Sequence, residues 1–326
     1  MRVPSFLPSH QISANLFPGT TAEEYVTSIG RREIQCIHKV KQLPRPLGIV
    51  NGPGLYQTCR DSKLSVLNEY LKVASYLLPA DRSIMPACLW HNDLHSDNIF
   101  VNPEKPTEIT CLIDWQSAHI EPLFMQAGHP SFLDFEGPKP EGLGAPSLPD
   151  DFNNMNEAQQ KRAESLLSQQ SLFKAYEILS LQKNKKVYHA LRHQKGLGCQ
   201  IITFAGNLLQ DGEPLVKGQL MQIQREWQQL PAVRARACPT CSLYFTSRDI
   251  LAQKTEETKW IQGLELMSQV LESLGTVDRG WHGWVKAEDY ALFKIKLDSV
   301  RETFLDQLSE TEEDRQKWLS AWPFKD

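Results

Sequence analysis

An asparagine and an aspartate, sixteen positions apart in the sequence, are placed where their side chains could act together. Asn98 precedes a short apolar run, residues 99–101, and Asp114 follows a second apolar run, residues 109–113. Both runs are rich in β-branched and aromatic residues, and the turn-forming residues 102–107 separate them, so the pattern predicts an antiparallel hairpin. The residues that flank a hairpin lie at its open end. We therefore expect Asn98 and Asp114 to lie side by side.

An amide oxygen and a carboxylate that converge on one point are hard ligands of the kind that Mg²⁺ takes, together with water and substrate phosphates. Asp93 lies five residues before Asn98, in the loop that enters the same end of the hairpin. Its carboxylate could accept a proton from a hydroxyl nucleophile, or orient that hydroxyl, while the metal neutralises charge on a transferred phosphoryl group. The pattern therefore predicts a phosphoryl-transfer site with Asp93 as the catalytic base. Asn98 and Asp114 are its predicted metal and cofactor ligands.

The spacing of these residues resembles a known family. His91, Asp93 and Asn98 follow the pattern His-x-Asp-x-x-x-x-Asn, and an Ile-Asp pair ends at Asp114. This is similar to the catalytic loop and metal-binding aspartate of the aminoglycoside phosphotransferase and choline kinase group, within the protein-kinase-like superfamily. The resemblance implies ATP and Mg²⁺ as cofactors, and it implies that His91 supports the loop. His95 also fits the pattern, without a definite role.

A narrower resemblance lies just beyond the hairpin. Residues 113–117, with residues 122–124 and 129–131, are similar to the fungal phosphotransferases that include the "altered inheritance of mitochondria" proteins. One segment departs from the related antibiotic kinases, in which a Gly-Asp-Pro segment follows the metal-binding aspartate and its aspartate anchors the loop. This chain has Ala-Gly-His-Pro at residues 127–130. The sequence therefore leaves the anchor of the catalytic loop open.

The resemblance implies an α+β, mostly helical fold. We expect the C-terminal lobe of a protein-kinase-like enzyme, with a catalytic β-hairpin and a helical subdomain, and with the N-terminal β lobe largely absent. The first residues contain three prolines and no helical period, so they are interpreted as a linker or a remnant of that lobe. The predicted domains are the linker at 1–20, the catalytic core at 21–136, a Pro/Gly-rich loop at 137–155 and the helical subdomain at 156–326.

Apolar periodicity predicts the helices. Thr21 and Glu24 form a capping box, and the stripe that follows predicts a helix that ends near Leu43, before a proline. A second stripe predicts a helix over residues 64–78. Four more stripes predict helices at residues 166–179, 215–227, 260–274 and 290–308.

Composition and charge restrict the class of partner. The chain has 326 residues, 41% of them hydrophobic, a net charge of −4 and a pI near 6.2, which favour neither nucleic acid nor a membrane surface. No apolar run reaches the roughly 20 residues of a membrane-spanning helix. The resemblance implies a mitochondrial location, but no presequence is visible, which is also compatible with the cytoplasm. Seven scattered cysteines indicate reduced thiols, although Cys238 and Cys241 have a spacing that could form a zinc or redox site.

Three functional hypotheses remain open. The first is a small-molecule kinase that phosphorylates a hydroxyl acceptor. The second is an inactive kinase-like scaffold or binding module with a protein partner, and the third is a truncated gene model of an active enzyme. The acidic clusters at 256–257 and 310–314 could attract a cationic acceptor, but a solvated helical face explains them equally well. By its position, the loop at 137–146 is predicted to border the acceptor site.

Overall fold

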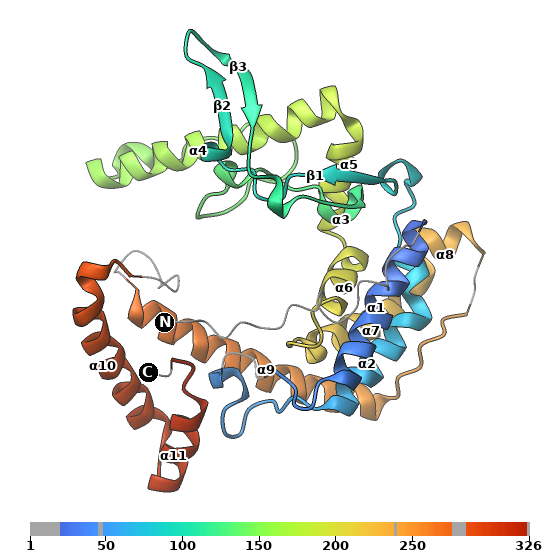
Figure 1. Cartoon of the computed structure of the whole chain (residues 1–326), viewed down its shortest axis with the longest axis vertical. Coiled ribbons are helices and arrows are strands. Elements are labelled where there is room, and N and C mark those ends of the chain that lie inside the picture. Colours follow the sequence, from blue (N-terminus) through green and yellow to red (C-terminus); the bar gives the residue numbers. More distant parts are fainter. Residues whose placement is uncertain (1–19, 45–47, 238–239, 276–284, 325–326) are drawn as a thin grey trace. The chain divides into compact units, whose positions relative to one another are not determined.

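The structure is a computed structural model that is mostly helical and has two small sheets (Figure 1). It describes residues 20–44, 48–237, 240–275 and 285–324. Contacts divide the chain into two compact units. Unit 1 contains residues 23–76 and the residues from 201 onward, and unit 2 contains residues 20–22 and 77–200. The α+β, mostly helical class is as predicted. The boundaries between the two units differ from the predicted domain bounds, and those bounds stay a prediction.

The helices and strands follow one another without a repeat. None of the helices in the described ranges is both long enough and apolar enough to cross a bilayer. The strands are β1 Ala87–Trp90, β2 Ile99–Asn102, β3 Lys105–Leu112 and β4 His119–Pro122. The helices are α1 Ala22–Lys39, α2 Arg60–Val73, α3 Leu123–Gln126, α4 Glu157–Lys183, α5 Lys185–Gln194, α6 Leu197–Ala205, α7 Glu213–Glu226, α8 Pro231–Ala235, α9 Ser247–Leu274, α10 Tyr290–Leu308 and α11 Glu312–Ala321.

Every helix predicted from an apolar stripe is present, although several bounds differ. α1 begins directly after Thr21, the predicted cap, but it ends at Lys39, before the predicted proline stop. α2 begins earlier than predicted because the Cys59 Sγ atom accepts a hydrogen bond from the Ser62 N–H at 3.3 Å and caps the helix. Gly275 ends α9 as predicted, but with φ −74° in place of the left-handed conformation typical of a C-terminal glycine.

The predicted hairpin is confirmed. β2 pairs with β3 in antiparallel orientation, with Ile99 opposite Leu112 and Asn102 opposite Lys105 (Figure 1). The turn is shorter than predicted, because only two residues separate the strands and the later predicted turn residues lie in β3. Asn102 Oδ1 accepts a hydrogen bond from the Glu104 N–H at 3.0 Å, which closes this tight turn locally.

A second two-stranded sheet was not predicted. β1 pairs with β4, with Leu89 opposite Ile120. The sequence contains little signal for this strand pair, because β1 and β4 are only four residues long and lie far apart along the chain. Gln126 joins them, since its Nε2 atom donates to the Cys88 carbonyl oxygen at 2.5 Å and to the Glu121 carbonyl oxygen at 2.9 Å.

A buried ion pair joins α2 to α7 in unit 1. Lys63 Nζ lies 2.8 Å from Glu213 Oε2, and neither side chain is more than 1% exposed. Lys63 also donates to the Leu208 carbonyl oxygen at 2.7 Å, and the Tyr56 hydroxyl donates to Glu213 at 3.0 Å. Because both charges are hydrogen-bonded, the desolvation cost of burying them is offset, and the pair fixes how these helices pack.

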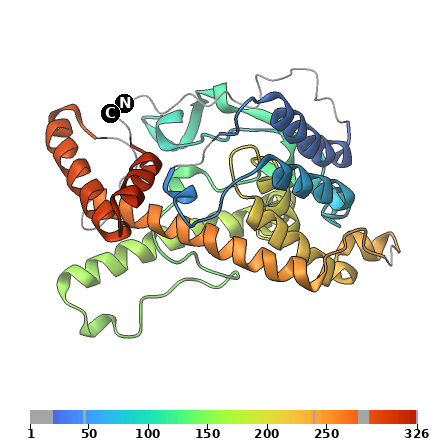
Figure 2. The same ribbon diagram turned by 90° about the horizontal axis from the view of Figure 1, so that it is seen from below.

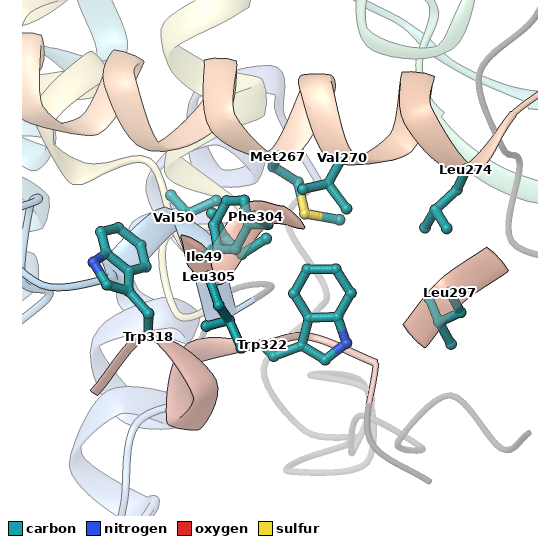
Figure 3. Packing of buried hydrophobic residues seen from close by; sticks show 10 residues of the cluster. All are labelled: Ile49, Val50, Met267, Val270, Leu274, Leu297, Phe304, Leu305, Trp318 and Trp322. Atoms are coloured by element: carbon teal, nitrogen blue, oxygen red, sulfur yellow. The ribbon is translucent and has the colours of Figure 1, made fainter. Parts of the chain in front are cut away.

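The C-terminal helices form a hydrophobic core in unit 1. α9 is the long helix that leads to α10 and α11 (Figure 2), and its apolar side chains face Ile49, Val50 and the indole rings of Trp318 and Trp322 (Figure 3). Gly263 on α9 lies against the backbone of Val50, where a Cβ atom would come within 2.5 Å of the carbonyl oxygen. Only glycine therefore allows this close packing.

We predict that Gly263→Ala destabilises unit 1 even though alanine favours helix by about 1 kcal/mol. The added methyl group meets backbone, which cannot move aside as a flexible side chain can. Urea denaturation measures the change. The matched control is Gly218→Ala on α7, because the nearest atom there is the carboxylate end of Glu257. Equal stability changes in the two variants would contradict the packing argument.

Candidate active site

The loop between β1 and β2 is fixed to the open end of the hairpin. His91 Nε2 donates to the Ile113 carbonyl oxygen at 2.8 Å, and the Ile113 N–H donates to the Asn98 carbonyl oxygen at 3.1 Å. The Asn98 amide nitrogen in turn donates to the Asp93 carbonyl oxygen at 2.8 Å. Asn98 and the residue before Asp114 are thus hydrogen-bonded neighbours, and Asp93 is held in the same loop. The bond from His91 fits the supporting role predicted for it.

Asp114 has an uncommon backbone conformation. Its φ of 62° and ψ of 53° lie in the left-handed region, which aspartate and asparagine enter more readily than most residues. Trp115 packs against the His91 ring with 4.8 Å between centroids, and its indole nitrogen donates to the Leu112 carbonyl oxygen at 3.0 Å. These contacts hold a sharp turn directly after β3, and backbone strain of this kind is common at functional sites.

The donors at the open end fit Mg²⁺. Asn98 is buried and its amide nitrogen is engaged by the loop, which leaves the Oδ1 atom for a cation, while Asp114 offers a carboxylate. Within the described ranges, no group of three or more His, Cys, Asp or Glu could hold a metal ion by itself. Two protein oxygens suit Mg²⁺, which keeps several waters and takes phosphate oxygens as further ligands. For the Cys238 spacing no geometry is described, because Cys238 lies outside the described residues.

Asp93 is accessible to a substrate. Its side chain is 48% exposed, and its Oδ2 atom lies 3.9 Å from His95 Nε2. The same His95 nitrogen lies 3.1 Å from the Asn98 amide nitrogen. His95, for which the sequence indicated no role, therefore lies between the predicted base and a predicted metal ligand.

A second contact holds the loop of Asp93 from the side of α4. The Ser131 N–H and hydroxyl both donate to the Leu94 carbonyl oxygen at 3.1 Å. Two residues earlier, the His129 ring stacks on Phe173 of α4, with 3.8 Å between centroids and 9° between planes. His129 Nε2 also lies 3.8 Å from Glu177 Oε1. In this chain, Ser131 thus anchors the loop for which the sequence left the anchor open, and His129 fixes the segment of Ser131 to α4.

A cavity of about 540 Å³ lies beside this anchor in unit 2. Its walls include His129 and Ser131, two lysines, Lys139 and Lys195, and the buried ring of Phe173. The cavity therefore borders the segment that bonds to the loop of Asp93.

Sequence reasoning missed several residues that support the site. Ser131 was noted only as part of a resemblance, and Gln126 was not noted, because each has a hydrogen-bonded partner far along the chain, Leu94 for Ser131 and Cys88 for Gln126. Lys174 and Glu177 were hidden by the apolar stripe of α4. They form a buried pair at 2.5 Å, and their spacing of three residues along the helix was the available signal.

Comparison with known families supports the general class. Residues 41–128 match the APH family, the phosphotransferase enzyme family, and this range contains Asp93, Asn98 and Asp114. The match ends just before the segment that holds His129 and Ser131, and before the other residues that line the cavity. The narrower resemblance to proteins of mitochondrial inheritance stays a prediction.

Two curated relatives cover most of the chain. They are subtelomeric hrmA-associated cluster proteins from two strains of Aspergillus fumigatus, and each is 28% identical to this chain over 318 residues. The matched region is 94% of this chain and 58% of each relative, so the chain spans a little over half the length of these relatives. No solved structure matches the chain.

The burial of His129 leads us to predict that the stability of the chain depends on pH. Burial lowers the pKa of His129, and the attraction of Glu177 only partly opposes this effect. In the unfolded chain the pKa of this histidine returns to about 6.5, so the unfolded state binds more protons as the pH falls. The contribution of the buried, neutral His129 to the unfolding free energy is therefore complete above about pH 6.5, and it is lost as the pH falls below this value.

We predict that His129→Phe, which keeps an aromatic ring against Phe173 but cannot titrate, weakens this pH dependence. The unfolding free energy, measured with urea at about pH 7.5 and about pH 5.5, should fall less in the variant than in the parent. Some dependence should remain, because burial also lowers the pKa of His193. His38→Gln, at an exposed position on α1, is the control. An unchanged slope in His129→Phe would refute the assignment.

Proposed function

We propose that this chain is an ATP-dependent phosphotransferase of the protein-kinase-like superfamily, which transfers the γ-phosphoryl group to a hydroxyl of a small molecule. One observation carries the proposal. The register of the hairpin and the hydrogen bonds of the loop gather Asp93, Asn98 and Asp114 at one end of β2 and β3, within the range that matches the phosphotransferase family.

Each residue has a distinct task. The exposed Asp93 carboxylate orients the acceptor hydroxyl and accepts its proton. Asn98 holds the loop through its amide nitrogen and presents its amide oxygen, and Asp114 presents a carboxylate. These two residues would hold Mg²⁺, which when bound would neutralise charge on the phosphates of ATP. His91 and Ser131 keep the loop in place through their hydrogen bonds to Ile113 and Leu94.

We predict that Asp93→Asn lowers the rate of transfer by about 10²- to 10⁴-fold, the usual contribution of a positioned base, and leaves the fold intact. The fold survives because only the Asp93 backbone oxygen is held by Asn98. Phosphorylation of a panel of hydroxyl compounds with labelled ATP measures the rate, and urea denaturation checks the fold. Asp97→Asn, in the same loop, is the control. Equal rates in the parent and in Asp93→Asn would disprove the base assignment.

Asp114→Asn tests the metal ligand. Asparagine tolerates the left-handed backbone, so the variant removes a charge without adding strain. ATP at one hundred times its dissociation constant adds about 2.7 kcal/mol to the stability of the folded state. We predict a Mg²⁺-dependent rise in Tm with ATP in the parent chain and a much smaller rise in Asp114→Asn.

The same measurement separates the proposal from an inactive scaffold. A scaffold that does not bind nucleotide would show no rise in Tm with Mg-ATP in either protein. If Asp114→Asn and Asp97→Asn gave the same rise as the parent, Asp114 would not be a metal ligand.

A further inference from the structure

The cavity of about 540 Å³ in unit 2 is connected to the catalytic loop by one residue. Ser131 lines the cavity, and its N–H and hydroxyl both donate to the carbonyl oxygen of Leu94 at 3.1 Å. Leu94 directly follows Asp93. A molecule in the cavity therefore lies beside the segment that fixes the predicted base.

The charges around the cavity leave a positive surplus. Lys139 and Lys195 line it together with Asp134, and Lys139 Nζ lies 2.6 Å from Asp134 Oδ1. Glu177 does not line the cavity, and its Oε2 atom pairs with Lys174 Nζ at 2.5 Å. Lys195 Nζ lies 4.0 Å from the other carboxylate oxygen of Glu177, Oε1. Three lysines thus stand against two carboxylates, and the side chain of Lys195 is 53% exposed.

His129 adds no charge to this balance near neutral pH. Burial lowers its pKa, and its ring is stacked on Phe173. Conversely, the ion pair with Lys139 lowers the pKa of Asp134, so this carboxylate stays ionised and occupied. The surplus therefore resides mainly on Lys195.

The remaining walls are formed by two apolar residues and by Gln194, whose amide nitrogen donates to the Met125 carbonyl oxygen at 3.0 Å. Phe173 and Leu191 line the cavity, and each is less than a tenth exposed. Such a surface suits a ring, and it gains little from a small, fully hydrated molecule. The acidic clusters at 256–257 and 310–314, which could have attracted a cation, belong to unit 1 and line no part of this cavity.

We propose that this cavity binds the acceptor of the phosphotransferase and that the acceptor is a small hydroxylated anion with a ring. This inference rests on the function proposed above. The ring packs against Phe173 and Leu191, and the anionic group, a carboxylate or a phosphate, pairs with Lys195. The acceptor hydroxyl is left to face the loop of Asp93.

Three compounds that share a hydroxyphenyl group and differ in charge test the proposal. They are 4-hydroxyphenylacetate, which is anionic, tyrosol, which is neutral, and tyramine, which is cationic. Saturation-transfer NMR with the full chain, without nucleotide, measures each dissociation constant. We expect the anion to bind most tightly and the cation most weakly.

Two substitutions should change the affinity for 4-hydroxyphenylacetate in opposite directions. Lys195→Gln removes the surplus charge and should weaken binding by about three- to tenfold. Asp134→Asn removes the competing carboxylate and releases Lys139, so it should tighten binding, which general damage to the fold would not do. Lys186→Gln, at an exposed position on α5, the helix that ends one residue before Lys195, is the matched control and should change nothing.

Several outcomes would overturn the inference: binding of tyramine as tight as that of the anion, no saturable binding of the anion at millimolar concentrations, or equal effects of Lys195→Gln and Lys186→Gln. Failure of the proposed function is distinguishable, because it would appear as absence of the Mg-ATP stabilisation and of phosphoryl transfer. The binding of 4-hydroxyphenylacetate is measured without either.

Discussion

The hydrogen bond from the Ile113 N–H to the Asn98 carbonyl oxygen sets the geometry on which the candidate site depends. It closes the open end of the hairpin, and it places Asp114 one residue beyond a paired backbone. A slip of one residue in the register would turn every side chain of β3 to the opposite face and move the carboxylate away from Asn98. His91 bonds to the carbonyl oxygen of the same Ile113, so both polar backbone groups of this residue hold the site.

The parts of the fold that sequence predicts well are those that local patterns determine. The hairpin follows from two apolar runs and a turn, and the position of Asn98 near Asp114 follows from the hairpin alone. The longer helices α1, α2, α4, α7, α9 and α10 follow from apolar periodicity, whereas the shorter helices α3, α5, α6, α8 and α11 were not predicted. The ends of the longer helices are less predictable, because single contacts such as the cap at Cys59 decide them.

The parts that sequence did not predict depend on partners far along the chain. β1 and β4 have no local signal that assigns them to each other, and Ser131 acquires a role only because Leu94 lies beside it. On α4 the predicted apolar face is partly wrong, since Leu179 is 53% exposed while Lys174 is buried with Glu177. A long lysine side chain can be buried when its ammonium group is paired, and hydropathy does not register the pairing.

Unit 2 interrupts unit 1, because the chain leaves unit 1 after Tyr76 and returns to it at Ile201. This arrangement orders the events of synthesis. The hairpin and its helices emerge from the ribosome before α7 exists, so unit 2 can fold while α1 and α2 still lack their partners. The pair between Lys63 and Glu213 must then close over 150 positions. Between these two residues the folded unit 2 takes the place of a long flexible loop, which lowers the entropy cost of bringing Lys63 and Glu213 together. The nascent chain can thus complete unit 2, which holds the candidate site, before it completes unit 1.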